Sequence, residues 1–308
     1  MLSGGGARSA YQAGVLEYVS EAFPEAEFPI LTGVSAGAIN TAHLANHTES
    51  FPAAAQHLVE SWENLQLDNV VAVESGLSLL WGLLWRNSFA EESSEGGSRT
   101  HIRRTHGLLD TTPLWSYLNE HIGAEEGRMT GIAKNLDSGR LRAVAVITTN
   151  YATGQTVTWV QGEDFEVWER PDRISRHTRL TIDHVMASTA LPLVFPAVEI
   201  DQAWYGDGGI RLSAPLAPAV HLGADRILAV SNHHQRSRAE ADAPAVTGYP
   251  PTAQIIGILM NAIFSDALDQ DAYTIERVNA LLRELPPSKR HGMRPVDLLQ
   301  IRPSVDLG

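Results

Sequence analysis

The spacing of hydrophobic residues along the chain alternates between the periods of helices and strands. Helical spacing is found over residues 11–19, where Ala13 and Leu16 lie on one face. A short apolar run over 29–31 indicates the end of a buried strand, and residues 38–44 again have helical spacing. The first part of the chain is therefore predicted to form a helix, a short strand and a second helix.

The rest of the chain continues this alternation. Helices are predicted over 46–65, from the cap at 110–113 to His121, over 182–189, over 215–222, and over 252–285 with a break near Asp271. Strands are predicted over 141–149, 156–160, 198–200, 204–205, 226–230 and 298–301, the first two forming a hairpin, and residues 233–251 are predicted to form a loop. Because no linker divides this pattern, we expect one α/β domain over residues 1–308, with a mostly parallel central sheet flanked by helices.

Composition narrows the class of protein. Hydrophobic residues make up 44% of the 308 residues, enough for a sizeable core. The net charge of −13 argues against a nucleic-acid-binding protein, because such a protein needs a basic face. The chain has no cysteine, which excludes disulfides, thiolate catalysis and cysteine-based metal sites. It also has no opening signal segment and no run of about 18 apolar residues, which predicts a cytoplasmic protein.

One serine lies in a sequence typical of a strained turn between a strand and a helix. Gly33, Ser35 and Gly37 match the pattern G-x-S-x-G, with the predicted strand before them and the predicted helix after them. The two glycines allow strand and helix to approach closely, and the helix directs its positive end toward the turn. Ser35 is therefore a candidate nucleophile, placed early in the chain.

A glycine-rich loop precedes the first helix. Its residues are Gly4, Gly5, Gly6, Ala7 and Arg8, and they follow three residues that are too few for a full strand, so the printed sequence is expected to begin inside its first strand. Successive backbone N–H groups in such a loop bind an anion, either a nucleotide phosphate or the oxyanion of an acyl-transfer intermediate. Ser9 occupies the position where a nucleotide-binding loop has its third glycine, which disfavours the first alternative.

Ser35 needs a base, and two kinds of base are candidates. A Ser-His-Asp triad on an α/β-hydrolase fold requires several strands before the nucleophile, and only one strand and one helix fit before Ser35. The downstream histidines His221, His233, His234 and His291 lie in no recognisable context. The other candidate is Asp207, which lies among Gly206, Gly208 and Gly209 directly after a predicted strand. A carboxylate that is partly removed from water has a raised pKa and can serve as a general base.

The order of these three motifs resembles the patatin-like phospholipase family. The glycine-rich loop, the turn at 33–37 and the Asp207-Gly208-Gly209 sequence appear in the family's order, and the stretches 109–114, 187–192, 215–230 and 301–304 are also similar to bacterial members. The resemblance implies a three-layer α/β/α sandwich. It further implies an acyl hydrolase that cleaves lipid esters with a Ser35–Asp207 dyad and no catalytic histidine. Gly4, Gly5, Gly6, Ala7 and Arg8 would form the oxyanion hole, and Gly33, Gly37, Gly208 and Gly209 would support the motifs. One departure is Ser9, which replaces the usual glycine after the arginine and is expected to narrow the loop without removing its donors.

This resemblance implies partners as well as chemistry. The substrate would be a lipid or phospholipid acyl ester, met at a peripheral membrane or micelle surface, with no nucleic acid, no metal and no organic cofactor. A helical, lid-like insertion is expected at about 66–130. Within it, the apolar residues 76–86 are either a buried core helix or a segment that contacts acyl chains. Arg99, His101, Arg103, Arg104 and His106 are either a solvated basic face or a contact for lipid phosphate. A Ser-His-Asp esterase, a nucleotide-binding protein and a non-catalytic scaffold remain as alternatives.

Overall fold

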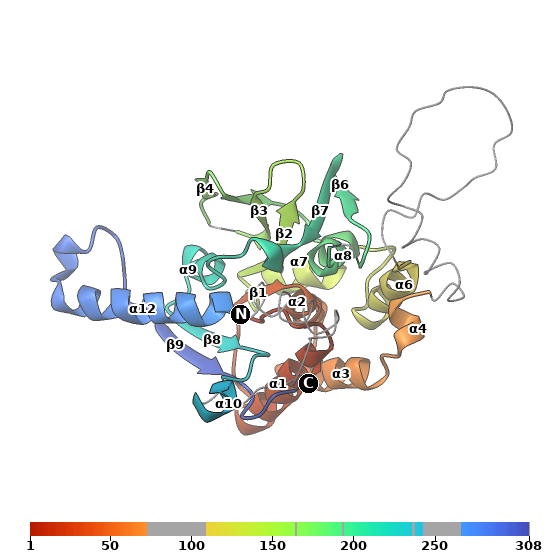
Figure 1. Ribbon diagram of the computed structural model, residues 1–308, viewed down its shortest axis with the longest axis horizontal. Helices are drawn as coiled ribbons and strands as arrows, with labels where there is room; N and C mark the ends of the chain where they lie inside the picture. Colours follow the sequence, from red (N-terminus) through yellow and green to blue (C-terminus); the bar gives the residue numbers. More distant parts are fainter. Residues whose placement is uncertain (73–108, 164, 193, 236–237, 243–265, 308) are drawn as a thin grey trace, which may run out of the picture.

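A mixed sheet runs through the centre of the molecule (Figure 1). The computed structural model describes residues 1–72, 109–163, 165–192, 194–235, 238–242 and 266–307. The strands are β1 (Ile30–Val34), β2 (Ala143–Asn150), β3 (Thr156–Gly162), β4 (Glu169–Arg170), β5 (Arg173–His177), β6 (Val198–Ile200), β7 (Ala203–Asp207), β8 (Arg226–Val230) and β9 (Asp297–Ile301). The β1–β2, β3–β5 and β8–β9 pairs are parallel, and the β2–β3, β2–β7, β4–β5 and β6–β7 pairs are antiparallel. The α/β class is confirmed, with antiparallel pairs added beside the parallel ones.

Strand β2 is the centre of this sheet. Its eight residues are all buried, which explains its unbroken apolar and small-residue sequence. Side chains alternate between the two faces, so Val144 and Val146 pack into one hydrophobic cluster while Ala143 and Ala145 pack into another. β2 pairs with β3 along one edge and with both β1 and β7 along the other. Leu2 bridges Gly33 of β1 and Val230 of β8 and so connects the β8–β9 pair to the main sheet.

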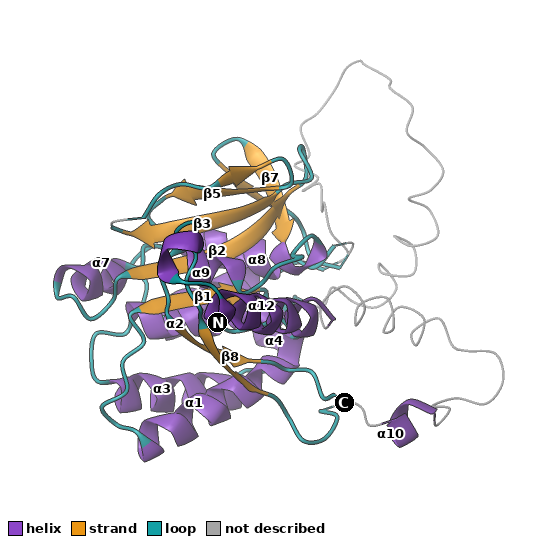
Figure 2. Ribbon diagram, turned by 90° about the vertical axis from the view of Figure 1, so that its left-hand side faces the viewer, coloured by secondary structure: helices purple, strands orange, loops and turns teal. Residues whose placement is uncertain are grey.

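Helices cover both faces of the sheet (Figure 2). They are α1 (Ala10–Ala22), α2 (Ala36–Asn46), α3 (Phe51–Glu63), α4 (Leu67–Val70), α6 (Thr112–His121), α7 (Thr130–Asp137), α8 (Ile182–Thr189), α9 (Ala217–His221), α10 (Arg238–Asp242) and α12 (Asp266–Glu284), with 3₁₀ turns η1 (Gly6–Ser9), η2 (Gly208–Ile210) and η3 (Pro287–Lys289). Helices α2 and α8 pack on β2, α9 packs on β1, and α1 packs along α3. Among the described residues, no helix is long and apolar enough to cross a bilayer.

The carboxyl-terminal part of the chain differs from the sequence prediction in two places. α12 continues through Asp271, where a break was predicted. Asp271 does not interrupt the helix because its side chain reaches across to accept the backbone N–H of Leu216, 2.8 Å away. α10 occupies part of the segment predicted to be a loop. The apolar segment 76–86 and the basic residues of 99–106 lie outside the described residues, so both interpretations of them stay predictions.

Candidate active site

The register of β2 brings two distant strand ends together. β1 runs parallel to β2 and ends with Val34 opposite Ile147. β7 runs antiparallel to β2 and ends with Asp207 opposite Thr148, the next residue of β2. The chain therefore leaves β1 at Ser35 and leaves β7 at Gly208 at almost the same point of the sheet. Backbone pairing thus places the candidate nucleophile beside the candidate base.

The turn at Ser35 has the strained geometry that its sequence predicts. Ser35 has φ 53°, a left-handed backbone conformation that is uncommon for a residue with a side chain. A Cβ on Gly33 would lie 2.2 Å from Thr41 Oγ1, and a Cβ on Gly37 would lie 2.3 Å from the carbonyl oxygen of Leu2. Both glycines are therefore required by close backbone packing. This packing holds Ser35 in place at the start of α2.

Ser35 and Asp207 form a direct hydrogen bond. Ser35 Oγ donates to Asp207 Oδ2 over 2.6 Å, and the other carboxylate oxygen accepts the backbone N–H of Gly209 over 2.8 Å. Asp207 is 1% exposed and Ser35 is 8% exposed. A Cβ on Gly208 would lie 2.2 Å from the carbonyl oxygen of Ile147, so only glycine fits between Asp207 and the sheet. Gly208 and Gly209 therefore hold the carboxylate against the serine, one by close packing and the other by its N–H.

Burial changes the acid–base properties of Asp207. Removal from water raises the pKa of its carboxyl to about 7, although the hydrogen bonds from Ser35 and Gly209 act in the opposite direction. Near neutral pH this carboxylate can take up and release a proton. A group with such a pKa, 2.6 Å from a serine hydroxyl, can act as the general base for that hydroxyl.

A second serine supports the turn. Ser188, in α8, accepts the backbone N–H of Ser35 over 2.9 Å and donates to the carbonyl oxygen of Ile147 over 2.6 Å. It is fully buried and ties the turn to β2. A lone serine in a helix carries no signal of such a role in a single sequence, which is why sequence reasoning did not identify it.

The glycine-rich loop lies beside this pair. A Cβ on Gly4 would lie 3.0 Å from the Cβ of Ser35, so the loop backbone passes directly next to the serine. Gly5, Gly6, Ala7 and Arg8 line the same cavity as Ser35 and Asp207. The structure therefore brings all five loop residues predicted from the sequence to the Ser35–Asp207 pair.

Ser9 and Asn232 anchor the loop from behind. The Nδ2 group of Asn232 donates to Ser9 Oγ over 2.8 Å and to the carbonyl oxygens of Ser3 and Gly4 over 3.3 and 3.2 Å. Ser9 is fully buried, and its carbonyl oxygen accepts Asn40 Nδ2 over 3.0 Å. Ser9 therefore serves as an anchor of the loop, a role that its position in the motif did not reveal. Asn232 is the second residue after the end of β8, and nothing in the sequence around it indicates this role.

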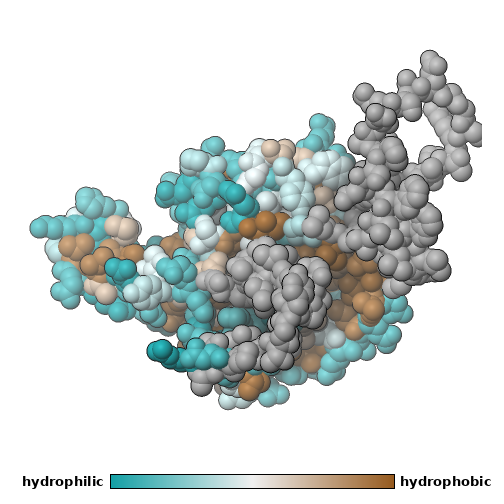
Figure 3. Space-filling view, in the orientation of Figure 1, coloured by the Kyte–Doolittle hydropathy of each residue, from teal (hydrophilic) through white to brown (hydrophobic). Residues whose placement is uncertain are grey.

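The cavity at Ser35 is predominantly apolar. Its volume is about 490 Å³, and its lining contains apolar side chains from α2, α3, α4, α6 and the residues after α8. They are Ile39, Trp62, Leu65, Leu67, Val70, Leu114, Leu191 and Phe195. Apolar surface is visible in the region of α4 and α6, where Leu67 is 71% exposed (Figure 3). Such a lining suits a hydrocarbon chain better than a nucleotide.

Histidines and metal ligands are not gathered at this cavity. None of its described lining residues is a histidine, and His221, one of the candidates in the sequence, stacks on Trp168 with ring centroids 4.7 Å apart. Within the described ranges, no three His, Asp or Glu side chains are arranged to hold a metal ion. The site as described therefore offers a carboxylate as the base for Ser35.

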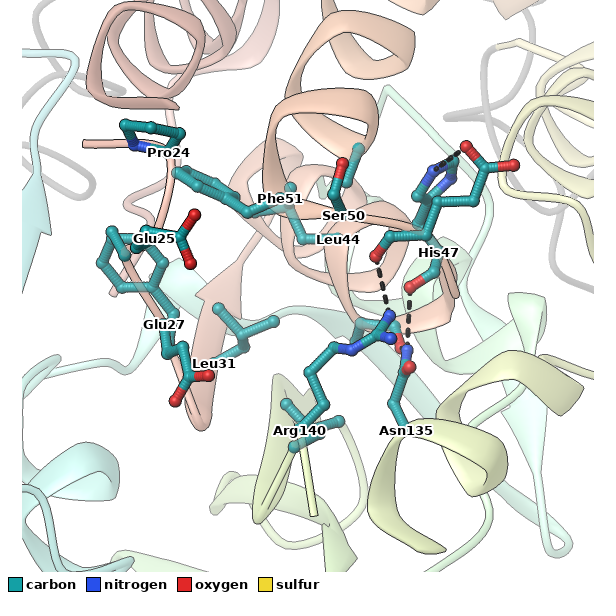
Figure 4. A pocket seen from close by; sticks show the side chains of 16 residues that line it. Pro24, Glu25, Glu27, Leu31, Leu44, His47, Ser50, Phe51, Asn135 and Arg140 are labelled. Carbon is teal, nitrogen blue, oxygen red and sulfur yellow. Dashed lines mark hydrogen bonds and ion pairs between the residues drawn. The ribbon is translucent and has the colours of Figure 1, made fainter. Parts of the chain in front are cut away.

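A second hollow, of about 240 Å³, lies at the opposite end of β1 and α2 (Figure 4). Arg140 donates to the backbone carbonyl of Glu49 over 2.7 Å, and Asn135 donates to that of His47 over 2.8 Å. These side chains are used to hold the chain where it leaves α2. The hollow shares no lining residue with the cavity at Ser35, and Arg140 and Asn135 in its wall serve the fold.

The chain belongs to the patatin-like phospholipase family, whose model matches residues 1–220 and thus includes Ser35 and Asp207. Members of this family are lipid acyl hydrolases, and their substrates are lipids. Among solved structures, VipD from Legionella pneumophila matches with a TM-score of 0.41 and 13% identity over 98% of this chain. The chain spans 60% of the length of VipD. A search of curated proteins found no match.

Proposed function

We propose that this protein hydrolyses carboxylic esters of lipids with Ser35 as nucleophile and Asp207 as the only base. The observation that carries the proposal is the 2.6 Å hydrogen bond from Ser35 Oγ to the buried Asp207 Oδ2 at the wall of an apolar cavity. A serine hydroxyl is a weak nucleophile until a neighbouring base accepts its proton. Asp207 is the group placed to do this.

The reaction has two steps that use the same pair. Ser35 Oγ attacks the ester carbonyl carbon and its proton moves to Asp207 Oδ2. Asp207 then returns the proton to the leaving alcohol, which leaves an acyl group on Ser35. In the second step Asp207 takes a proton from water, the hydroxide attacks the acyl-enzyme, and the proton returns to Ser35 Oγ as the fatty acid departs. Among the described residues, the proposed reaction uses the dyad, the oxyanion donors and water.

Backbone N–H groups are proposed to stabilise the negative charge on the carbonyl oxygen. The loop from Gly5 to Arg8 lines the cavity next to Ser35, and Gly4 lies directly beside Ser35. Helix α2 begins directly after Ser35 with its positive end toward the same point. Donors fixed in this way favour the oxyanion over the neutral carbonyl, because their dipoles need no reorganisation during the reaction. Gly4, Gly5, Gly6, Ala7 and Arg8 are therefore proposed as the oxyanion hole.

Action at a lipid surface is part of this proposal. Leu67, on α4 at the cavity that holds Ser35, exposes 71% of its surface to solvent. An exposed apolar side chain beside a catalytic cavity favours contact with a membrane or micelle. A cytoplasmic location with peripheral membrane contact remains the expectation.

The acyl-enzyme is the intermediate that tests the proposal directly. Wild-type protein mixed with a p-nitrophenyl ester and quenched in acid should gain the mass of one acyl group, which peptide mapping places on Ser35. Ser35→Ala should gain no mass and hydrolyse no ester. Modification at another residue, or ester hydrolysis by Ser35→Ala at the wild-type rate, would exclude Ser35 as the nucleophile.

The pKa of Asp207 predicts the pH dependence of the reaction. Only the carboxylate form can accept the serine proton, so kcat/KM should be half-maximal near the Asp207 pKa of about 7, level off about one pH unit above it, and fall at lower pH as Asp207 becomes protonated. The expected slope is tenfold per pH unit, so kcat/KM at pH 5 should be about 100-fold below the plateau. Rates for a soluble ester between pH 5 and 9 measure this profile. A plateau that extends to pH 5 would show that Asp207 is not the base.

Two substitutions in the glycine-rich loop should distinguish the effect on kcat of moving the loop from the effect on stability of backbone strain. A Cβ on residue 5 would lie 2.7 Å from Asn232 Nδ2 and 2.9 Å from its Cβ, so Gly5→Ala must move the loop or its anchor. A Cβ on residue 6 would meet nothing within 4 Å, although Gly6 has φ 59°. Gly5→Ala is expected to lower kcat by about 10²–10³-fold, the cost of losing one oxyanion donor. Gly6→Ala is expected to lose about 1 kcal/mol of stability with a much smaller change in kcat. Kinetics and thermal melts of both variants provide the comparison, and equal losses of kcat would count against the loop as the oxyanion hole.

A further inference from the structure

The apolar cavity at Ser35 is adjoined by a second, deeper cavity. The deeper cavity has a volume of about 20 Å³ and shares four side chains with the first, namely Ile39, Trp62, Leu65 and Leu114. Its other lining residues come from α2, α3 and α6 and from Ile122, the residue directly after α6. The two hollows are therefore separated only by side chains of their common wall, and together they mark a path from Ser35 into the space between these helices.

One face of α2 follows this path. Ser35 lies at the start of the helix, and Ile39 and His43 follow at intervals of four residues, so the three side chains share one face. Ser35 lines the first cavity, Ile39 lines both, and His43 lines only the deeper one. Eight residues of helix correspond to about 12 Å along its axis. An extended hydrocarbon chain of roughly ten carbon atoms has the same length.

A hydrogen bond holds the wall of the path near Ser35, and the residues at its far end are buried. The Trp62 Nε1–H donates to Asn40 Oδ1 over 2.7 Å, which fixes the indole on α3 beside α2. At the far end, Leu58 is fully buried and Leu118 is 2% exposed. His43 is buried as well, and burial together with the nearby His47 and His57 lowers the pKa of its imidazole to about 4. The imidazole is therefore uncharged at neutral pH and can lie against a hydrocarbon chain.

We propose that the acyl chain of the substrate lies along this face of α2, between α3 and α6, with Ile39 controlling the passage into the deeper cavity. This inference rests on the proposed hydrolytic function and deepens it. Ile39 must move to admit the chain, because the deeper cavity has a volume of only about 20 Å³. Medium-length chains of about ten carbons are then the preferred acyl groups, because a longer chain meets the buried residues around His43.

Chain-length profiles of Ile39 variants test this assignment. For wild-type protein, kcat/KM for p-nitrophenyl esters from two to sixteen carbons should rise by up to roughly fourfold per buried methylene group and stop rising near ten carbons. Ile39→Trp blocks the passage, so the ratio of kcat/KM for the ten-carbon ester to that for the four-carbon ester should fall at least about tenfold. Ile39→Ala widens the passage and should move the optimum to longer chains.

A matched control and a binding measurement separate this inference from loss of stability or of function. Leu222 is 1% exposed and packs with Ala143 and Val160 on the other face of the sheet, so Leu222→Ala should lower the melting temperature but leave the chain-length profile as in the wild type. In a Ser35→Ala background, calorimetry should show that Ile39→Trp weakens the binding of decanoate at least about tenfold. If all esters lose activity equally in Ile39→Trp, or if decanoate binds equally well, the path along α2 is wrong while the dyad stands. If wild-type protein hydrolyses no ester, both proposals are overturned.

Discussion

Ser35→Ala and Asp207→Asn are each expected to lower kcat for ester hydrolysis by about 10⁴–10⁶-fold, and the double variant should be no slower than the worse single variant. In the proposed mechanism the two side chains act as one unit, because the serine proton leaves along the 2.6 Å hydrogen bond between them. Once either is removed, the other has nothing to contribute. Asparagine has nearly the shape of aspartate, so Asp207→Asn removes the base while keeping the packing. Rates with a soluble ester, measured beside circular dichroism spectra, give the comparison.

Histidine variants provide the control for this result. The chain has twelve histidines, and alanine at each of them in turn should leave substantial activity. One histidine variant as inactive as Ser35→Ala, with an unchanged fold, would replace the dyad by a triad. Multiplicative losses in the double variant would show that Ser35 and Asp207 act independently.

Although Asp207→Asn is expected to lower activity, it is expected to raise the stability of the folded protein. The size of this gain should depend on pH. Burial raises the pKa of Asp207 from 3.8 to about 7, so between these values the folded state holds a proton that the unfolded state has released. Wild-type protein should therefore lose stability as the pH rises through this window, whereas the asparagine variant should not. The shift corresponds to about 4 kcal/mol in the free energy of unfolding. The advantage of the variant over wild type should grow by up to that amount from pH 4 to pH 8.

Urea unfolding at several pH values measures this difference. Both proteins should unfold with the same dependence on urea concentration, so that the midpoints report stability alone. Asp137→Asn, a substitution of an exposed aspartate on α7, is the matched control and should show no such trend. A difference between Asp207→Asn and wild type that stays constant with pH would show that the carboxyl is ionised in the folded protein throughout.

The site could be predicted from the sequence where it depends on local backbone geometry. A serine between Gly33 and Gly37 implies a tight turn, and the structure has that turn with the positive φ of Ser35. Asp207 was identified because glycines beside a carboxylate indicate close approach to another part of the chain. The strand and helix signals around these motifs were also sufficient, as β1, β2, β7, α2 and α8 lie where the hydrophobic spacing placed them.

Residues that act through long-range hydrogen bonds could not be predicted in this way. Ser188 and Asn232 are ordinary polar residues in their own segments, and their partners lie 153 and 223 residues away, at Ser35 and Ser9. Asp271 was misread for a related reason, because its partner is the N–H of Leu216 and no signal near position 271 indicates that contact. In each case the information is in the tertiary structure, which hydrophobic periodicity does not encode.

The shared edge of β2 also determines when during synthesis the proposed dyad can be assembled. The turn at Ser35 spans five residues, which leave the ribosome early together with β1 and α2. Its base is 172 residues further along the chain and arrives only when β7 pairs beside β1 on β2. A nascent chain, or one cut before β7, thus carries the serine without the carboxylate. If the proposed dyad is right, ester hydrolysis is in this way withheld from the incomplete chain until its sheet has been assembled.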